Sequence, residues 1–412
     1  MRDYDAVIFG ASGFTGQYIA VEWAKTCKKS YRWALAGRSK AKLEATRQHV
    51  QEEIGSEANI PIVIADVFDE PAMAALCSST RLVINCTGPY RLFGEPVVRA
   101  CVAAGTHYVD ITGEPQFIET MALRYHADAE RAGALVVHSC GFDSIPSDMG
   151  AVFASNQFPE GGCCCSIETF ISLTGKRGHA TTYECIVLGL AAADDLKALR
   201  QAQSVKVPYF GPRLQLRSLG YDERVRKYFV KFMGADASVV RATQKHLVQS
   251  RATTPPVQFA VYATFASLAS FVPLVLGGVV LYALSRFEAG RQLLIKYPAF
   301  FTFGYFSHTG PSAAEIAGST FTHRFFAKGY KDKSNVEGNK PDWEVTTRVD
   351  GPEPGYVATS SMVVSAAAVV LDDEVAARGV LTPGAAFRNT TLIERLQRRG
   401  INFTLEKSEA VA

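Results

Sequence analysis

Short apolar runs alternate with longer amphipathic stretches along the first third of the chain. The apolar runs lie at residues 6–9, 33–36, 61–65, 82–85, 107–109 and 135–138. Between them, apolar residues recur every three or four positions, as in 40–54 and 114–132, which is the spacing of an amphipathic helix. Short strands separated by helices predict an α/β fold with a doubly wound parallel sheet. Ligands of such a sheet collect at the carboxyl ends of its strands.

The first apolar run leads into three glycines and then into a helical pattern. A turn of this kind lets the backbone approach a pyrophosphate, and the free N–H groups at the helix start favour phosphate. We therefore expect a dinucleotide cofactor on this turn. The expected contacts are Gly10, Ala11, Ser12, Gly13, Phe14, Thr15 and Gly16. The alternative is an ordinary strand-to-helix turn that contains three glycines.

The end of the second apolar run indicates which dinucleotide is bound. In an NAD site, a carboxylate about twenty residues after the glycine turn holds the 2′-hydroxyl of the ribose. Here Arg38 takes that place, with Ser39 and Lys42 close behind it. Because guanidinium and ammonium groups suit a 2′-phosphate, the sequence predicts NADP(H). The alternative is a solvated arginine in a polar loop.

Polar and turn-forming residues follow the next predicted strands. We expect Asp66 to contact the adenine end of the cofactor, and Thr87, Gly88 and Pro89 to contact its ribose or diphosphate. Each residue type is also common in turns, so any one of them has a structural explanation. Their recurrence at successive strand ends favours a ligand site.

Hydride transfer also requires a group that supplies or removes a proton. None of the sixteen tyrosines is followed by lysine four residues later, so the acid dyad of short-chain dehydrogenases is missing. The catalytic candidates are Tyr90 and Asp143, with Asp110 as a further carboxylate at a strand end. Asp143 has an alternative role as the cap of the helix that follows it.

Composition narrows the class of protein. A chain of 412 residues, 48% of them hydrophobic, is long enough for two domains, and its net charge of +3 does not suggest nucleic acid binding. The nine cysteines are odd in number and lack paired spacing, so we expect reduced thiols in a cytosol-like compartment and no metal site. The first strand begins almost at once, so we expect neither a targeting peptide nor secretion.

One segment in the second half of the chain needs a different explanation. No charged residue occurs from Ala252 to Ser285, a length that usually indicates a membrane span. Pro273 divides it into arms too short to cross, and basic residues at both ends favour the cytoplasmic side for both flanks. We expect residues 255–285 to contact a membrane or lipid-droplet surface, as an apolar hairpin that enters one leaflet or as two apolar helices that lie in the interface. The alternatives are buried core helices or the subunit interface of a homodimer.

Several of these motifs together resemble the saccharopine dehydrogenase-like oxidoreductases. The resemblance is carried by residues 10–16, 36–39, 85–90, 108–114, 140–148 and 379–387. The motif at 140–148 is the most specific of them. The resemblance implies an NADP-binding Rossmann domain at 1–141 and an α+β substrate domain at 142–350. It also implies a C-terminal helical segment at 351–412 that packs back on the Rossmann domain.

The activity that the resemblance implies is NADP(H)-dependent oxidoreduction. Together with the apolar segment, it favours reduction of an acyl or lipid-linked substrate, as in an enoyl reductase, at a membrane or lipid-droplet surface. Two alternatives stay open. One is a soluble saccharopine reductase acting on an amino acid, and the other is a non-catalytic NADP(H)-binding protein of a membrane surface.

Overall fold

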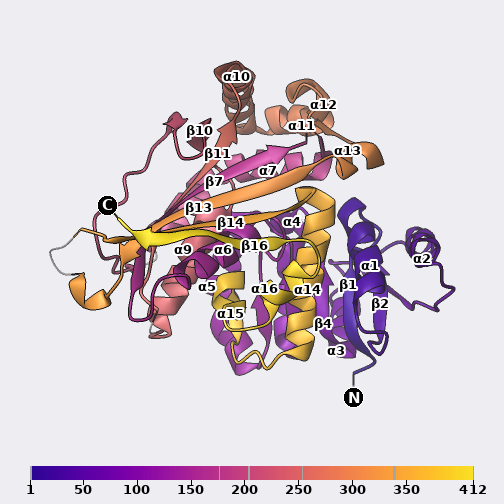
Figure 1. Ribbon diagram of the computed structural model, residues 1–412. Coiled ribbons are helices and arrows are strands. Elements are labelled where there is room, and N and C mark those ends of the chain that lie inside the picture. The colour runs from indigo at the N-terminus through magenta and orange to yellow at the C-terminus, as the bar shows by residue number, and fades with distance from the viewer. Residues whose placement is uncertain (1, 176, 203–204, 253, 337–339, 412) are drawn as a thin grey trace. The chain divides into compact units, whose positions relative to one another are not determined.

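The computed structural model describes residues 2–175, 177–202, 205–252, 254–336 and 340–411, and Figure 1 shows its helices and strands. Contacts divide the chain into two compact units, each made of two pieces of sequence. Unit 1 comprises Met1–Ile145 and Gly355–Arg399. Unit 2 comprises Pro146–Pro354 and Gly400–Ala412.

Unit 1 is built on a parallel sheet of seven strands in the order β15-β6-β5-β4-β1-β2-β3. The strands are β1 (Tyr4–Phe9), β2 (Trp33–Gly37), β3 (Ile62–Ile64), β4 (Thr80–Asn85), β5 (His107–Asp110), β6 (Leu135–Val137) and β15 (Gly379–Leu381). Six of them arise from the apolar runs of the N-terminal region. The predicted doubly wound, Rossmann-type sheet is therefore confirmed.

Helices cover both faces of this sheet, which explains why its strands are continuous apolar runs. The helices of unit 1 are α1 (Phe14–Thr26), α2 (Lys40–Ile54), α3 (Glu70–Ser79), α4 (Tyr90–Ala104), α5 (Pro115–Arg131), α14 (Thr359–Asp372), α15 (Pro383–Phe387) and α16 (Leu392–Gln397). Val7 and Phe9 pack toward α3, α4 and α5, while Ala6 and Ile8 face the other layer, and all four are almost fully buried.

The chain returns to unit 1 near its C-terminus. Every residue of α14 from Thr359 to Val370 is buried, because its serines, alanines and valines let it pack tightly against α1, β4 and β5 (Figure 1). β15 then pairs with β6 at the edge of the sheet. The expected C-terminal helical segment at 351–412 does supply helices to unit 1, but it also contains β15 and β16 (Asn402–Ala410). The expectation was wrong for β16, which pairs with β14 in unit 2.

Unit 2 contains a mixed sheet of seven strands in the order β16-β14-β13-β7-β11-β10-β9. These strands are β7 (Cys163–Thr174), β9 (Leu219–Asp222), β10 (Lys227–Lys231), β11 (Gln258–Phe265), β13 (Thr320–Tyr330), β14 (Trp343–Pro352) and β16. Helix α6 (Ile145–Ser155) lies close to this sheet, since a Cβ atom on Gly150 would be 2.2 Å from Phe325 of β13.

Further helices complete unit 2. They are α7 (Ala180–Ala191), α8 (Ala193–Ala202), α9 (Asp236–Gln249), α10 (Leu268–Ser285), α11 (Glu288–Lys296), α12 (Pro298–Phe301) and α13 (Ala313–Ala317). Two short strands, β8 (Gly178–His179) and β12 (Phe306–Ser307), pair with each other. A 3-10 turn at Lys333–Asn335 and a π-helical turn at Pro354–Ala358 are the remaining helical pieces of the described chain.

The apolar segment at 255–285 does not form the expected hairpin. Its first part is β11, which lies between β7 and β10, with Val261 and Tyr262 buried. Its second part is the single helix α10, which continues through Pro273. The side chains of residues 268–274 lie outside the described part of the structure. The prediction was wrong because a central strand and the helix after it can form one uninterrupted apolar run.

Helix length and hydropathy single out a different element as a candidate membrane span. Among the described residues, one helix, Pro354–Asp372, is long and apolar enough to cross a bilayer, and 78% of its apolar window is buried. Such burial is typical of a core helix.

Candidate cofactor and catalytic site

The glycine turn between β1 and α1 excludes side chains at two of its positions. Gly10 has a φ of +81°, and a Cβ atom there would be 2.7 Å from Cγ2 of Thr87. A Cβ atom on Gly16 would be 2.3 Å from the carbonyl oxygen of Gly10. The turn therefore holds bare backbone at the carboxyl end of β1, where a phosphate group can approach closely.

Helix α1 offers its N-terminus at this turn. The N-cap residue is Gly13, and no side chain caps the helix. Because the first N–H groups of a helix lack partners within the helix, those of Phe14, Thr15 and Gly16 are suited to an anion. Residues 10–16, including Thr15, thus form one continuous backbone surface that can bind phosphate, which we call the cradle.

Residues at the end of β2 extend this cradle. A Cβ atom on Gly37 would be 4.0 Å from the Ser12 hydroxyl, so the end of β2 touches the glycine turn. Arg38 follows directly and is exposed, and Lys42 is exposed in the first turn of α2. Ser39 is the N-cap of α2, and its side chain forms no capping hydrogen bond. Within the described chain, neither Arg38 nor Lys42 forms an ion pair, so both suit a 2′-phosphate.

Asp66 and Thr87 are held by local hydrogen bonds at the ends of β3 and β4. One carboxylate oxygen of Asp66 accepts a bond from the Phe68 N–H at 3.0 Å, as in a turn. Asn85 accepts bonds from the N–H and the hydroxyl of Thr87. The methyl group of Thr87 faces Gly10, which places this threonine beside the glycine turn.

The segment after Thr87 leads into α4. The Gly88–Pro89 peptide bond is cis, and Pro89 is the N-cap of α4. Glu114, which is 2% exposed, accepts bonds from the N–H groups of Tyr90 and Arg91 at 2.7 and 3.2 Å. The start of α4 is thus stabilised by a buried carboxylate.

The hydroxyl of Tyr90 lies between two strand ends. It donates to the carbonyl of Asn85 at 2.9 Å and accepts from the Ile111 N–H at 3.4 Å. Both strand ends are carboxyl ends of parallel strands, as is the end of β1, so Tyr90 lies at the same edge of the sheet as the glycine turn. To give its proton to a substrate, Tyr90 would have to release the Asn85 carbonyl.

Asp110 is the centre of a buried polar network that sequence reasoning missed. One of its carboxylate oxygens accepts from the Tyr108 hydroxyl at 2.9 Å and lies 2.7 Å from Nδ1 of His138. The other accepts from the N–H groups of Thr112 and Ser139. These partners enclose Asp110, so a substrate cannot reach it. We therefore assign Asp110 a structural role, in which it holds the ends of β5 and β6 together. The sequence did contain a signal for this network, because a polar residue stands at the end of three consecutive apolar runs: Asn85, Asp110 and His138.

Asp143 has a different environment from Asp110. Burial raises the pKa of this carboxyl from 3.8 to about 6. One of its oxygens would be 2.8 Å from a Cβ atom placed on Gly113, so Asp143 lies against the segment that follows β5. No hydrogen bond joins its carboxylate to another residue of the described chain. A carboxyl group that titrates near neutrality can hold and release a proton.

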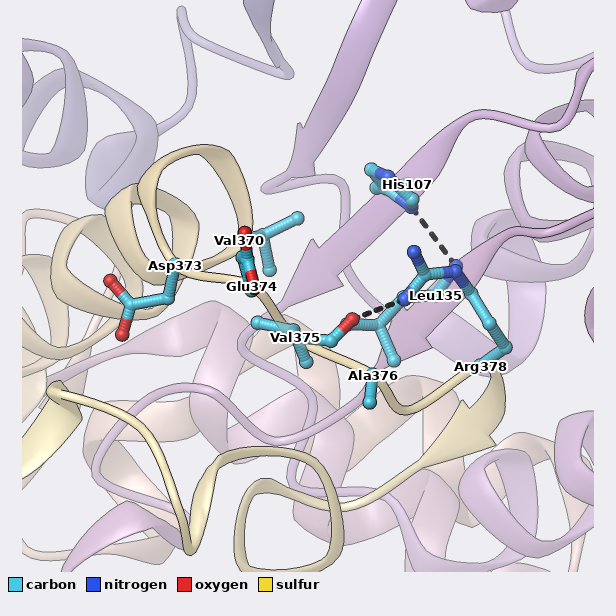
Figure 2. Close-up of a pocket in the computed structure, with 8 residues that line it drawn as sticks. All are labelled: His107, Leu135, Val370, Asp373, Glu374, Val375, Ala376 and Arg378. Atoms are coloured by element: carbon cyan, nitrogen blue, oxygen red, sulfur yellow. Dashed lines mark hydrogen bonds between the residues drawn. The ribbon is translucent and has the colours of Figure 1, made fainter.

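A pocket of about 390 Å³ lies at the opposite edge of the unit 1 sheet, at the amino ends of β5 and β6. Figure 2 shows the eight residues that line it, among them His107 and Arg378. Burial and nearby arginines lower the pKa of His107 to about 4. Its Nδ1 accepts a bond from the Leu135 N–H at 3.1 Å, so this imidazole is neutral and supports the sheet. Since the glycine turn lies at the carboxyl ends, this pocket is separate from the candidate cofactor site.

The described residues contain no group of three or more His, Cys, Asp or Glu side chains that could hold a metal ion. Cys163, Cys164 and Cys165 are buried at the start of β7.

Comparison with known proteins agrees with this geometry. The sequence profile of the saccharopine dehydrogenase NADP-binding domain matches residues 6–137. A saccharopine dehydrogenase-like oxidoreductase of Pongo abelii is 40% identical, with 100% of this chain and 99% of the relative aligned. A lipid droplet localized protein of Caenorhabditis elegans is 34% identical, with 98% and 99% aligned. A putative trans-acting enoyl reductase of Mycobacterium tuberculosis is 30% identical, with 97% of each aligned.

A solved structure has the same fold. Apo saccharopine dehydrogenase (L-Glu forming) from Saccharomyces cerevisiae superposes with a TM-score of 0.57, at 15% identity, over 99% of this chain and 100% of that one.

Proposed function

Since the chain belongs to the saccharopine dehydrogenase-like oxidoreductases and its first domain binds NADP(H), we propose that it reduces an acyl or lipid-linked substrate at a lipid surface. The observation that carries the oxidoreductase part is the cradle of bare backbone at Gly10 and Gly16, flanked by the exposed cations Arg38 and Lys42. The cradle receives the diphosphate, and the cations receive the 2′-phosphate.

The residues proposed for the remaining cofactor contacts lie at the same edge of the sheet. Ser12, within the glycine turn, has its hydroxyl near Gly37 at the end of β2, and the methyl group of Thr87 lies against Gly10. We assign the ribose and diphosphate to Thr87, Gly88 and Pro89, and the adenine side to Asp66. Bound NADPH supplies hydride, so the protein has to orient the acceptor and provide a proton.

Asp143 is the proton donor in this proposal. Reduction of an enoyl group adds a hydride to one carbon and a proton to its neighbour, and a carboxyl with a pKa of about 6 is partly protonated near neutral pH. Tyr90 is the second candidate, and its contact with Asn85 orients its hydroxyl at the strand ends.

A lipid-linked substrate is favoured by two relatives and by the surface of unit 2. The names of the nematode and mycobacterial relatives refer to a lipid droplet and to enoyl reduction. Unit 2 exposes a series of large apolar side chains on α10 and the elements after it. We place the protein at the cytoplasmic face of a membrane or lipid droplet.

The test is consumption of NADPH by the purified full-length protein with three acceptors in parallel: extracted membrane lipids, a medium-chain enoyl thioester, and the pair of amino acids that saccharopine reductases join. Consumption with lipid or enoyl acceptors supports the proposal. Consumption with the amino-acid pair alone would assign the protein to the saccharopine reductases. Binding of NADPH without consumption on any acceptor would identify a non-catalytic binding protein.

A further inference from the structure

Three consecutive helices of unit 2 form an exposed apolar surface, which we call the α10–α12 face. Its members are large apolar side chains between 42% and 81% exposed, on α10, α11, α12 and the turn that follows: Val275, Leu276, Val279, Val280, Tyr282, Leu293, Tyr297, Phe300 and Phe303. Figure 1 shows α10, α11 and α12 close together within unit 2. Isolated exposed apolar residues are ordinary, but a series this dense marks an interaction surface.

Over its described residues 275–285, helix α10 is apolar on two sides, one buried and one exposed. Leu281 and Leu284 pack on a small core with Tyr183, Val187 and Leu294 from α7 and α11. Leu276 and Val279 lie on the other side and are both 63% exposed. If α10 crossed a bilayer, its C-terminal half would lose this core. The helix is therefore suited to lie along a surface rather than to span it.

The charges within this stretch are mostly positive. Between residues 267 and 305, the chain carries Arg286, Arg291 and Lys296 but only one acidic residue, Glu288. Arg286 pairs with Asp194 and Arg291 pairs with Glu288, so Lys296 is the cation of this stretch that forms no ion pair within the described chain. The ammonium group of Lys296 lies 5.4 Å from the ring centroid of Tyr297, and the guanidinium of Arg286 lies 5.9 Å from that of Tyr282. Tyrosines and cations beside an exposed aliphatic stripe are the composition of a membrane interface, where anionic headgroups attract the cations.

We propose that the α10–α12 face binds the surface of an anionic phospholipid layer, with α10 in the plane of the interface and Leu276, Phe300 and Phe303 reaching the acyl boundary. This inference deepens the proposed function, because it identifies where the protein meets the layer that holds its substrate. A second copy fits this face less well. A two-fold axis through the face close to Lys296, which forms no ion pair within the described chain, would set that cation against its own copy and repel it.

The experiment is flotation of the full-length protein with two kinds of vesicles, phosphatidylcholine alone and phosphatidylcholine mixed with phosphatidylserine. The test variant is L276S/F300S/F303S. Its matched control is L123S/L216S/M233S, which removes side chains that are similarly exposed, at 62%, 66% and 80%, and that do not belong to α10, α11 or α12. K296E tests the charge contribution. Each sample is also titrated with NADPH and examined by light scattering.

We expect wild type and the control to bind the mixed vesicles, and the test variant to bind them at least about tenfold more weakly. K296E should reduce the preference for phosphatidylserine. Absence of wild-type binding to both vesicles, or equal binding by wild type and the test variant, would overturn the inference. So would a wild-type dimer that the test variant converts to a monomer. NADPH consumption without vesicle binding would refute the lipid-binding role of the α10–α12 face but not the reductase function. Vesicle binding without NADPH binding would refute the reductase function but not the lipid-binding role of the face.

Discussion

The methyl group of Thr87 lies against Gly10 so closely that a Cβ atom on the glycine would be 2.7 Å from it. This contact joins the end of β4 to the turn after β1. Because both segments are assigned to the cofactor, a change at either position should alter binding as well as packing.

Gly10→Ala should lower the free energy of unfolding by about 2–4 kcal/mol and weaken NADPH binding, since it combines a positive φ with a clash. Gly55→Ala is the matched control, because Gly55 has a φ of +60° but nothing within 4 Å of the added carbon. It should cost about 1 kcal/mol and leave NADPH binding unchanged. Urea unfolding and calorimetric titration measure both effects. Equal behaviour of the two variants would contradict the proposed role of the Thr87 contact.

Arg38→Ala should weaken NADPH binding by about 1.5–3 kcal/mol and leave NADH binding nearly unchanged, because only NADPH carries the 2′-phosphate. Lys29→Ala removes another exposed cation and serves as the control. Titration with each cofactor is the measurement. A similar loss for NADH and NADPH would exclude the assigned partner of Arg38.

Protonation of Asp143 should appear in the pH dependence of both activity and stability. Its pKa is higher when folded, about 6 against 3.8, so the folded protein holds this proton more tightly. The contribution to the free energy of unfolding is therefore fully present below about pH 4 and lost as the pH rises through about 6. If Asp143 is the acid, kcat/KM for reduction should also fall above about pH 6.

Asp143→Asn separates these two effects. It should be more stable than wild type at pH 8, because an amide has no charge to desolvate, and its activity should fall by about a hundredfold or more without the inflection near pH 6. Asp195→Asn, at an exposed position, is the control. An active Asp143→Asn with the wild-type pH profile would exclude Asp143 as the proton donor and leave Tyr90.

Asp110→Asn should destabilise the fold by about 3 kcal/mol, because it breaks a fully buried pair with His138 and disturbs the bond from Tyr108. Tyr108→Phe removes one of these bonds and should cost about 1–2 kcal/mol. The exposed Asp128→Asn should change stability by no more than about 0.5 kcal/mol. Denaturant unfolding distinguishes the three, and a loss as small for Asp110→Asn as for Asp128→Asn would refute the role given to the network.

The sequence was most informative where the signal is local. The strand before Gly10 and the turn after it lie within a dozen residues, so their pattern identified both. The partners of Asp110 were not visible, because Tyr108 is a neighbour but His138 lies twenty-eight positions away. The contact between Asp110 and His138 depends on β5 and β6 being neighbours in the sheet. An apolar run predicts a strand but does not indicate which strands will lie beside it.

Hydropathy failed at 255–285 for a related reason. Val261 is the same residue type as Val279 and Val280, yet it is buried in a central strand and the other two are exposed on a helix. The difference depends on which segments cover them. Likewise, the polar residues at 402–410 gave no sign of a strand. They form an edge strand, and its partner β14 lies about fifty residues earlier in the sequence, so no local pattern indicated the pairing.

The interleaving of the two units has a consequence for biosynthesis. A ribosome that has made residues 1–354 has supplied six of the seven strands of unit 1 and none of helix α14, so the sheet surface that α14 covers is bare at that stage. Unit 2 also lacks β16 until residues 402–410 are made. Unit 1 cannot reach its final state before residues 355–399 are made, nor unit 2 before residues 402–410 are made, and chains that stop before these segments should expose apolar surface and depend on chaperones or be degraded.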